Sequence, residues 1–329
     1  MTDSAPGGGD ATRSVGIGPA GIGPAGAEVS ESAPGGAGST PSAGLSPGGV
    51  PAADEQEGPA IEVIAHRGAS AELPEHSIEA YIEAIEVGAD LLECDVRLTA
   101  DGHLVCVHDP TTDRITGRRG RVSAMTLAQL RELDWGCATG GPLTLHDLCA
   151  LVRDCGRPVG LAVETKHPTR FGGATEQAVC DLLDHFGWLP LGEPGAVGDG
   201  AQDGIEDAAA APVRVMSFSA QALHRVRSRA PRLPRVLLLD KPAPVATRHT
   251  LPARAGSCGV DVELVRTQPA WVRAIVAAGP RVDVWTVDDE ADMDACLDLG
   301  AVGIITNRPR AALVHFGRRM PDVGEPFGA

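Results

Sequence analysis

From residue 60 onward, short hydrophobic runs alternate with longer segments in which apolar residues recur every three or four positions. The short runs are typical of buried strands, and the longer segments are typical of amphipathic helices. Examples are the runs EVIAHRG at 62–68 and RVLLLD at 235–240, and the helical segment SIEAYIEAIEVGA at 77–89. Strands that alternate with helices favour a parallel sheet with both faces covered.

The number of strand segments points to a closed barrel. About eight strand–helix units close into a (β/α)8 barrel, which commonly takes about 250 residues. We therefore predict an α/β fold of the TIM-barrel type. An open doubly wound sheet is the alternative, but the G-x-G-x-x-G sequence that often follows its first strand is absent. The predicted strands are 62–68, 91–98, 103–109, 158–167, 212–219, 235–240, 259–266, 281–289 and 303–309.

Two segments differ from the rest of the chain. Residues 1–59 are rich in Gly, Pro, Ala and Ser and almost lack large apolar side chains, so they cannot bury enough surface to offset the entropy lost on ordering. We predict a disordered leader at 1–59 and a single barrel domain at 60–329. Residues 191–212 are polar and rich in Gly and Ala, and we expect an exposed loop there.

Composition narrows the class of protein. The 329 residues carry a formal net charge of −16, which argues against nucleic acid or an anionic membrane as the main partner. The eight cysteines include no C-x-x-C pair, which favours a thiol-reducing compartment over a disulfide scaffold. No apolar run reaches the roughly 20 residues that span a bilayer, and the first residues lack the pattern of a secretory signal. We expect a cytoplasmic protein without stable membrane insertion.

Acidic side chains interrupt the apolar strands at regular positions. Because strand side chains alternate, Glu93 and Asp95 share one face, and so do Glu164 and Lys166. Leu92, Cys94 and Val96 then face the helices. Inward carboxylates are costly to bury unless they bind a cation. Oxygen ligands of this kind suit Mg²⁺ or Ca²⁺.

Further polar residues stand at or near predicted strand ends, where a barrel fold places its chemistry. His66 and Arg67 follow the first strand, His108 ends the segment after the Asp101-Gly102 turn, and Trp285 lies late in the seventh barrel strand. Each has an ordinary interpretation, as a packed or surface histidine, a turn, or a core aromatic. Their joint position at strand ends favours a functional site.

Several spaced motifs carry a resemblance to a known family. The run IAHRGASAELPEHSIEAYIEAIEVGADLLECDVRLTADGHLVCVHD at 64–109, with VETKH, MSFS, VWTVDD and GIITNRP later in the chain, resembles the glycerophosphodiester phosphodiesterase family. The match covers about residues 60–315, in the order of the family's motifs. The resemblance implies a TIM-barrel enzyme that uses a divalent metal to cleave glycerophosphodiesters to glycerol 3-phosphate and an alcohol.

The resemblance also implies roles for individual residues. The metal ligands would be Glu93, Asp95 and Glu164, and the acid–base pair would be His66 and His108. Arg67 and Lys166 match phosphate-contacting groups, Glu75 lies at the site edge, and Trp285 stands where an aromatic flanks the substrate.

This chain departs from the family pattern at two positions. His76 replaces the more common Asn, which puts the polar contacts of that residue in doubt, and Ser77 replaces Thr. The segment between His108 and Leu143 is short, so we expect only a small irregular insertion after the second strand.

The chemistry expected of such a site has two steps. One histidine removes the proton of the glycerol 2-hydroxyl, which attacks phosphorus, while the other protonates the departing alcohol; water then opens the cyclic phosphate. We favour His66 as the base and His108 as the acid. Two alternatives stay open: a related barrel that acts on lysophospholipids or sphingomyelin, and a non-catalytic barrel that binds phosphodiesters.

Overall fold

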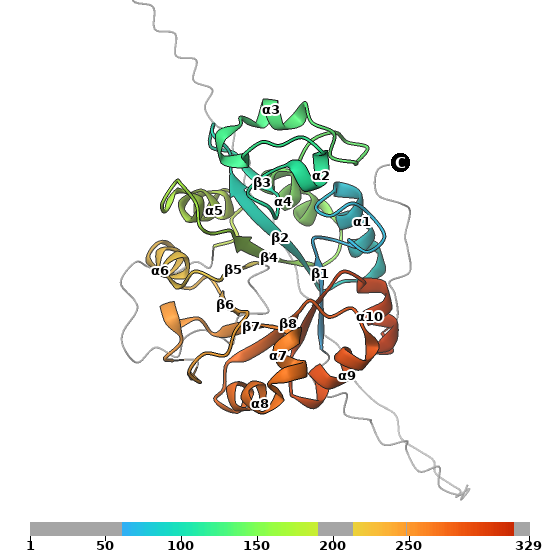
Figure 1. Cartoon of the computed structure of the whole chain (residues 1–329), viewed down its shortest axis with the longest axis vertical. Coiled ribbons are helices and arrows are strands. Elements are labelled where there is room, and N and C mark those ends of the chain that lie inside the picture. Colours follow the sequence, from blue (N-terminus) through green and yellow to red (C-terminus); the bar gives the residue numbers. More distant parts are fainter. Residues whose placement is uncertain (1–60, 190–212, 248, 319–329) are drawn as a thin grey trace, which may run out of the picture. The chain divides into compact units, whose positions relative to one another are not determined.

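The computed structural model describes residues 61–189, 213–247 and 249–318 (Figure 1). The chain divides into two units, Met1–Glu55 and Gln56–Ala329, and every described residue belongs to the second. The predicted disordered leader at 1–59 and the predicted loop at 191–212 lie outside the described residues.

The described strands form one sheet in the order β1-β9-β8-β7-β6-β5-β4-β2-β3, and β1 also pairs with β2. Each pairing is parallel except that of β2 with β3, which is antiparallel. Eight parallel strands therefore close into a barrel, and β3 folds back on the far end of β2. This confirms the predicted (β/α)8 barrel. The strands are β1 Glu62–His66, β2 Leu91–Leu98, β3 Leu104–Cys106, β4 Gly160–Thr165, β5 Val213–Ser217, β6 Arg235–Leu239, β7 Ser257–Asp261, β8 Arg281–Trp285 and β9 Gly303–Thr306.

Helices surround the strands in Figure 1. Side-chain caps fix where several of them begin: Ser77 accepts from the Ala80 backbone N–H before α1, and Thr144 accepts from Asp147 before α4, which satisfies N–H groups that a helix start leaves free. The helices are α1 Ile78–Val87, α2 Asp113–Thr116, η1 Val122–Ala124, α3 Leu127–Arg131, α4 Leu145–Asp154, α5 Ala174–His185, α6 Ala220–Arg229, η2 Pro252–Arg254, α7 Val262–Thr267, α8 Pro269–Ala277, α9 Glu290–Asp298 and α10 Pro309–His315.

Alternation along the strands separates two layers of core. Leu92, Cys94 and Val96 pack with helix residues such as Leu148 in the outer layer, as predicted. The smaller inner layer includes Ile64, Ala162, Met216, Val236, Leu238 and Ile305, with Leu91 and Trp285 packed against it. The barrel is therefore filled with side chains, and the inward positions beyond this layer are available for polar chemistry.

One predicted strand is partly wrong. The segment GVDVELVR at 259–266 was expected to be extended, but the strand β7 ends at Asp261 and α7 begins at Val262. The Asp261 carboxylate accepts a hydrogen bond from the Glu263 backbone N–H at 2.9 Å. Asp is a favoured residue at a helix N-cap, and this cap outweighs the strand preference of Val262 and Val265.

The segment between β3 and α4 holds three short helical turns, α2, η1 and α3. It has a small core of its own, to which Val105, Val122, Leu130 and Trp135 belong. These turns follow β3 and His108 in the chain, in the segment where a small irregular insertion was expected.

A cluster of charges lies at the amino-terminal ends of the strands. The Arg214 guanidinium contacts Glu62 at 2.9 Å and the fully buried Asp283 at 3.1 Å, and Arg281 contacts Glu62 at 2.6 Å and Asp283 at 3.2 Å. Polar residues at this end of a barrel usually contribute to stability rather than to chemistry.

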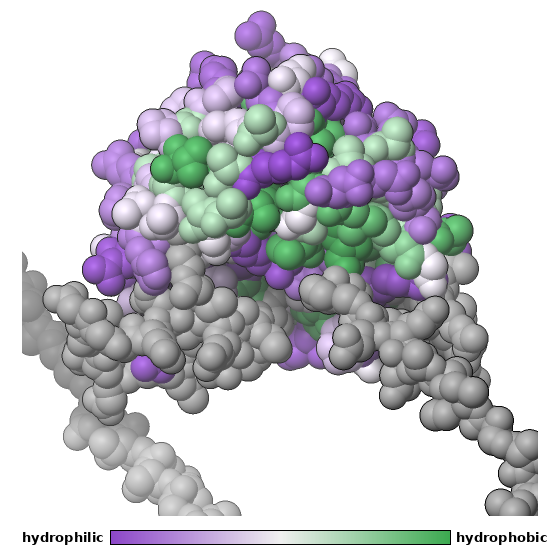
Figure 2. All heavy atoms as spheres, turned by 90° about the horizontal axis from the view of Figure 1, so that it is seen from below, coloured by the Kyte–Doolittle hydropathy of each residue, from purple (hydrophilic) through white to green (hydrophobic). Residues whose placement is uncertain are grey.

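The outer surface is mixed in character. The side shown in Figure 2 carries hydrophilic residues together with patches of hydrophobic ones, which is usual because apolar atoms contribute more than half of a typical protein surface. Within the described residues, no helix has both the length and the apolar character required to cross a membrane.

Candidate active site

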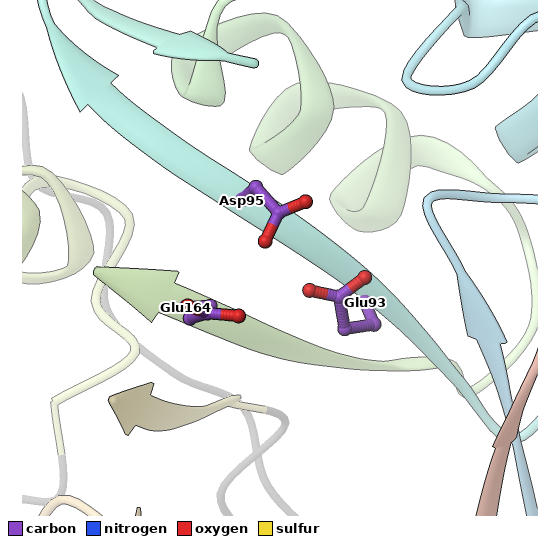
Figure 3. Close-up of side chains that lie close together, drawn as sticks. All are labelled: Glu93, Asp95 and Glu164. Atoms are coloured by element: carbon purple, nitrogen blue, oxygen red, sulfur yellow. The ribbon is translucent and has the colours of Figure 1, made fainter. Parts of the chain in front are cut away.

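Three carboxylates meet inside the barrel at its carboxyl-terminal end. Glu93 and Asp95 project from β2 and Glu164 from β4, and Figure 3 shows the three side chains turned toward a common space. Asp95 and Glu164 are register partners in adjacent parallel strands. One oxygen from each carboxylate lies within 4.8 Å of the others, and all three residues are buried.

The electrostatics of this cluster fit a bound cation. Burial and the Asp95 charge raise the pKa of Glu93 well above its ordinary value, and the same causes raise the pKa of Glu164 to about 7. The buried Asp95 Oδ1 atom is contacted by Lys166 Nζ at 2.8 Å, and the two cations Arg67 and Lys166 face three carboxylates. Three hard oxygen donors whose charge is incompletely offset match the ligand preference of Mg²⁺ or Ca²⁺.

Two basic side chains lie against the carboxylates. Arg67 Nε is 2.9 Å from Asp95 Oδ2, and Lys166 Nζ is 2.8 Å from Asp95 Oδ1 and 2.9 Å from Glu164 Oε1. The backbone N–H of Arg67 also donates to Glu93 Oε2 at 3.1 Å. These cations border the oxygen cluster, where they can bind an anionic group beside a metal ion.

The backbone after β1 takes an unusual path to deliver Arg67. Arg67 has φ 60° and Gly68 has φ 83°, a left-handed pair that L side chains seldom adopt. A Cβ on Gly68 would lie 2.6 Å from the Ala80 carbonyl carbon, so only glycine permits the close approach of this turn to α1. The His-Arg-Gly sequence is thus required by the turn as well as by its side chains.

Glu75 lies at the edge of the site within a chain of ion pairs. Its carboxylate contacts Arg67 Nη1 at 3.2 Å and receives two hydrogen bonds from Arg114, at 2.9 Å and 2.7 Å. Arg114 also donates to Asp109. The short helix α2 therefore links the Glu75 loop to the strand end of His108, a role for Arg114 that the sequence did not suggest.

His66 is held in one tautomer by its neighbours. Asn307 Nδ2 donates to Asp288 Oδ2 at 2.6 Å, so the Asn307 oxygen faces His66 Nδ1 at 2.7 Å and must accept from it. Nε2 then carries the lone pair. Burial, and next the Arg67 charge, lower the pKa of His66 to about 4, so the ring is neutral near pH 7.

His108 is more exposed and is held differently. Its Nδ1 lies 2.8 Å from Asp109 Oδ1, and its carbonyl oxygen accepts two hydrogen bonds from Arg97, at 3.0 Å and 2.7 Å. Burial lowers the pKa of His108, while the charges of Asp95 and the Asp109 hydrogen bond oppose that shift. In the described part of the chain, no hydrogen bond joins either imidazole, His66 or His108, to the three carboxylates.

His76 supplies a contact that the sequence left in doubt. Its Nε2 lies 3.1 Å from Asp95 Oδ2 and its Nδ1 lies 2.8 Å from the Tyr81 hydroxyl. His76 has φ 60°, a conformation in which Asn and His are enriched among non-glycine residues. The substitution of His for the common Asn therefore keeps the turn and a polar contact to the carboxylate cluster.

Trp285 lies at the boundary between the inner core and the site. Its indole packs against the inner layer and meets Phe218 edge-on, with ring centroids 5.5 Å apart. The Trp285 Nε1 atom is buried without a hydrogen-bond partner among the described residues. The two rings form an aromatic pair at the ends of β5 and β8.

Direct contacts join six of the residues that the sequence singled out: Arg67, Glu75, Glu93, Asp95, Glu164 and Lys166. Among the described residues, the side chains of His66, His108 and Trp285 make no hydrogen bond or ion pair with these six. Strand alternation extended by one step would have identified Arg97, which follows Glu93 and Asp95 on the same face of β2. Asn307 and Asp288 lie within the motifs GIITNRP and VWTVDD, but their contact with His66 depends on barrel closure and has no local signal.

Most of the chain is similar to known proteins. Residues 66–311 match the model of the glycerophosphoryl diester phosphodiesterase family. A Mycobacterium tuberculosis protein named probable glycerophosphodiester phosphodiesterase 1 is 42% identical over 258 residues, covering 75% of this chain and 89% of its own length. A Bacillus subtilis glycerophosphodiester phosphodiesterase is 31% identical over 261 residues, covering 75% of this chain and 83% of its own length.

Solved structures share the fold. A phosphodiesterase from Oleispira antarctica, solved with sn-glycerol-3-phosphate, has a TM-score of 0.63 and 21% identity, covering 78% of this chain and 96% of its own. A glycerophosphoryl diester phosphodiesterase from Silicibacter pomeroyi has a TM-score of 0.65 and 21% identity, covering 79% of this chain and 95% of its own.

Proposed function

Because the chain belongs to the glycerophosphoryl diester phosphodiesterase family, we propose that it hydrolyses glycerophosphodiesters to glycerol 3-phosphate and an alcohol. The observation that carries the proposal is the cluster of Glu93, Asp95 and Glu164 with Arg67 and Lys166 at its border. This arrangement offers sites for a divalent cation and for a phosphodiester anion side by side.

Glu93, Asp95 and Glu164 would hold the divalent metal ion, Mg²⁺ or Ca²⁺. When bound, the ion supplies positive charge to the phosphoryl oxygens, where negative charge builds in the transition state. Arg67 can add a bidentate contact and Lys166 a point charge to the same oxygens. Glu75 holds Arg67 at the site edge, and Trp285 would flank the substrate.

His66 is the proposed general base. Its Nε2 lone pair would take the proton of the glycerol 2-hydroxyl while that oxygen forms a bond to phosphorus and the bond from phosphorus to the alcohol oxygen breaks. The fixed tautomer and the pKa of about 4 support this role, since the ring is unprotonated before the reaction.

His108 is the proposed general acid. It would donate its proton to the departing alcohol oxygen, and its greater exposure makes it the easier of the two rings to protonate. In the second step, His108 would accept a proton from water as that oxygen bonds to phosphorus, and His66 would return its proton to the glycerol 2-oxygen as the ring of the cyclic phosphate opens. Both histidines then regain their starting states.

We also propose that this reaction takes place in the cytoplasm. All eight cysteines are free, and free thiols are typical of a reducing compartment.

The test is the release of glycerol 3-phosphate from glycerophosphocholine, measured with and without Mg²⁺ or Ca²⁺. We expect turnover that depends on the cation and stops with a chelator. Folded protein that shows no turnover with any divalent cation would overturn the proposal. Lysophosphatidylcholine run in parallel distinguishes a lysophospholipase of related fold, which would favour that substrate.

A further inference from the structure

A pocket of about 230 Å³ opens beside the carboxylate cluster, on the side of His108. It is lined by residues from the ends of β2, β4 and β5 and from the segment after β3, among them Arg97, His108, Glu164, Lys166, His167 and Phe218. Pockets that enclose drug-sized ligands span about 300–1,000 Å³, so this pocket can enclose a small alcohol but not an acyl chain. Since His108 is the proposed acid, the pocket lies where the leaving alcohol would depart.

Most charged groups of the pocket already have partners. Lys166 Nζ contacts Asp95 and Glu164 at 2.8 Å and 2.9 Å. Asp109, which also lines the pocket, pairs with His108 at 2.8 Å and with Arg114. These groups are therefore less available to a neutral part of the substrate.

Two side chains retain hydrogen-bonding capacity. Arg97 uses Nε and Nη2 to hold the His108 carbonyl oxygen, and its Nη1 has no hydrogen-bond partner in the described part of the chain. His167 Nε2 lies 2.6 Å from Glu176 Oε1, whereas its Nδ1 has no partner among the residues that the structure describes. The pocket thus holds a free donor on Arg97 and a free ring nitrogen on His167.

The free nitrogen of His167 has a defined chemical character. Glu176 is fully buried, and its other oxygen receives a hydrogen bond from Arg225 at 3.3 Å. A carboxylate can only accept, so His167 carries its proton on Nε2 and presents the Nδ1 lone pair as an acceptor in the neutral ring. The buried Glu176, itself contacted by the partly exposed Arg225, fixes both the tautomer and the orientation of the ring.

We propose that Arg97 and His167 form a subsite for the leaving alcohol that selects alcohols with a second hydroxyl group, such as glycerol. This inference rests on the proposed function. A hydroxyl group can accept from Arg97 Nη1 and donate to His167 Nδ1 at once. An ammonium group can only donate, so it cannot accept from Arg97 Nη1, and it would face the positive charge of that guanidinium. An alkyl group would leave both nitrogens unpaired, which is costly in a desolvated pocket.

Neighbouring strands bring the two residues together. Val96 and Thr165 are register partners in the adjacent parallel strands β2 and β4, so Arg97 lies one residue and His167 two residues beyond that pair. Thr165 also lines the pocket, and its buried hydroxyl has no hydrogen-bond partner among the described residues. The strand register therefore brings Arg97 and His167 to the same small pocket.

The test compares the glycerol 3-phosphate esters of three small alcohols: glycerol, 1-propanol and ethanolamine. We expect kcat/KM to be highest for the glycerol ester. The change His167→Ala should lower kcat/KM for the glycerol ester by about three- to tenfold more than for the propyl ester, as the loss of one hydrogen bond implies. His167→Gln retains polar atoms near the same place, so we expect it to recover part of the preference.

The control is His146→Ala on α4, an exposed histidine outside this pocket, and it should leave the substrate preference unchanged. Equal losses for the glycerol and propyl esters, or wild-type preference for the propyl or ethanolamine ester, would overturn the subsite. If the wild-type enzyme hydrolyses none of the three esters with any divalent cation, the proposed function itself fails. Thermal unfolding of each variant distinguishes a local change from a loss of fold. If His167→Ala does not fold, the ratio of kcat/KM for the glycerol and propyl esters is compared between His167→Gln and the wild type.

Discussion

His76 Nε2 lies 3.1 Å from Asp95 Oδ2, and both residues are buried. The other ring nitrogen of His76 is 2.8 Å from the Tyr81 hydroxyl. A carboxylate can only accept, so His76 donates from Nε2 to Asp95. The Tyr81 hydroxyl, which lies against Nδ1, donates to the Glu93 carbonyl oxygen at 3.1 Å. His76 therefore orients a proposed metal ligand, much as residues behind metal ligands do in other sites.

The change His76→Ala should weaken binding of the divalent cation by about 10- to 100-fold, because Asp95 loses the group that orients it. Ala is also strained at φ 60°, whereas His76→Asn tolerates that conformation and should lose less affinity. Calorimetric titration of the folded variants with Mg²⁺ or Ca²⁺ measures the effect. Wild-type affinity in His76→Ala would show that Asp95 needs no such support.

Removing one proposed ligand should have opposite effects with and without metal. Glu93 is buried beside Asp95, and its pKa is raised well above its ordinary value. With a chelator present, Glu93→Gln should therefore be at least as stable as the wild type, because the change removes a buried carboxyl group that lies beside the negative charge of Asp95. A cation at 100 times its Kd should stabilise the wild type by about 2.7 kcal/mol and the variant much less. Thermal unfolding of both proteins with and without the cation measures this difference. Equal stabilisation of the two proteins by the cation would contradict the role of Glu93 as a metal ligand.

The two histidines should respond differently to the leaving group. His108→Ala should lower kcat by about 10²- to 10⁴-fold for an alkyl ester, but much less for a nitrophenyl ester, whose leaving oxygen needs no proton. His66→Ala should lower kcat by a similar factor for both esters, because the base acts on the glycerol hydroxyl in each. If the nitrophenyl ester instead restores the kcat of His66→Ala, then His66 is the acid and His108 is the base.

The acid limb of kcat/KM should lie well below the ordinary histidine pKa of about 6.5. Burial lowers the pKa of His66 to about 4. A base with a lowered pKa stays unprotonated, and hence active, down to that lower pH, and it becomes inactive as the pH falls through about 4. The profile should be measured at saturating metal, because protons also compete for the carboxylates. An acid limb near pH 6.5 would show that His66 is not the group that titrates.

The fold was accessible from the sequence because hydrophobic alternation is a local signal that eight successive units repeat. The same alternation placed Glu93, Asp95 and Glu164 on inward faces, and the structure brings those carboxylates together. The hydrophobic pattern gave a wrong prediction where a helix cap was present. The expected strand at 262–266 is part of α7, which begins after the N-cap residue Asp261.

Contacts between distant segments were less accessible. The sequence marked His66 but not the Asn307 and Asp288 pair that fixes its tautomer, because 241 residues separate His66 from Asn307. Arg114 likewise joins Glu75 to Asp109 through the short helix α2, whose position depends on the packing of the small core beneath it. Such partners become visible only when the barrel closes.

The charge cluster at the other end of the barrel should matter for stability alone. Asp283 is fully buried and offsets both Arg214 and Arg281. The change Asp283→Ala should lower the free energy of unfolding by about 3–5 kcal/mol, because it leaves buried positive charge without its partner. Below the melting temperature, the activity per folded molecule should stay at the wild-type level.

The matched control is Asp181→Ala, which breaks an exposed pair with Arg229 and should cost less than about 1 kcal/mol. Urea unfolding of both variants measures the difference, and a similar loss in the two would contradict a structural role for the buried cluster.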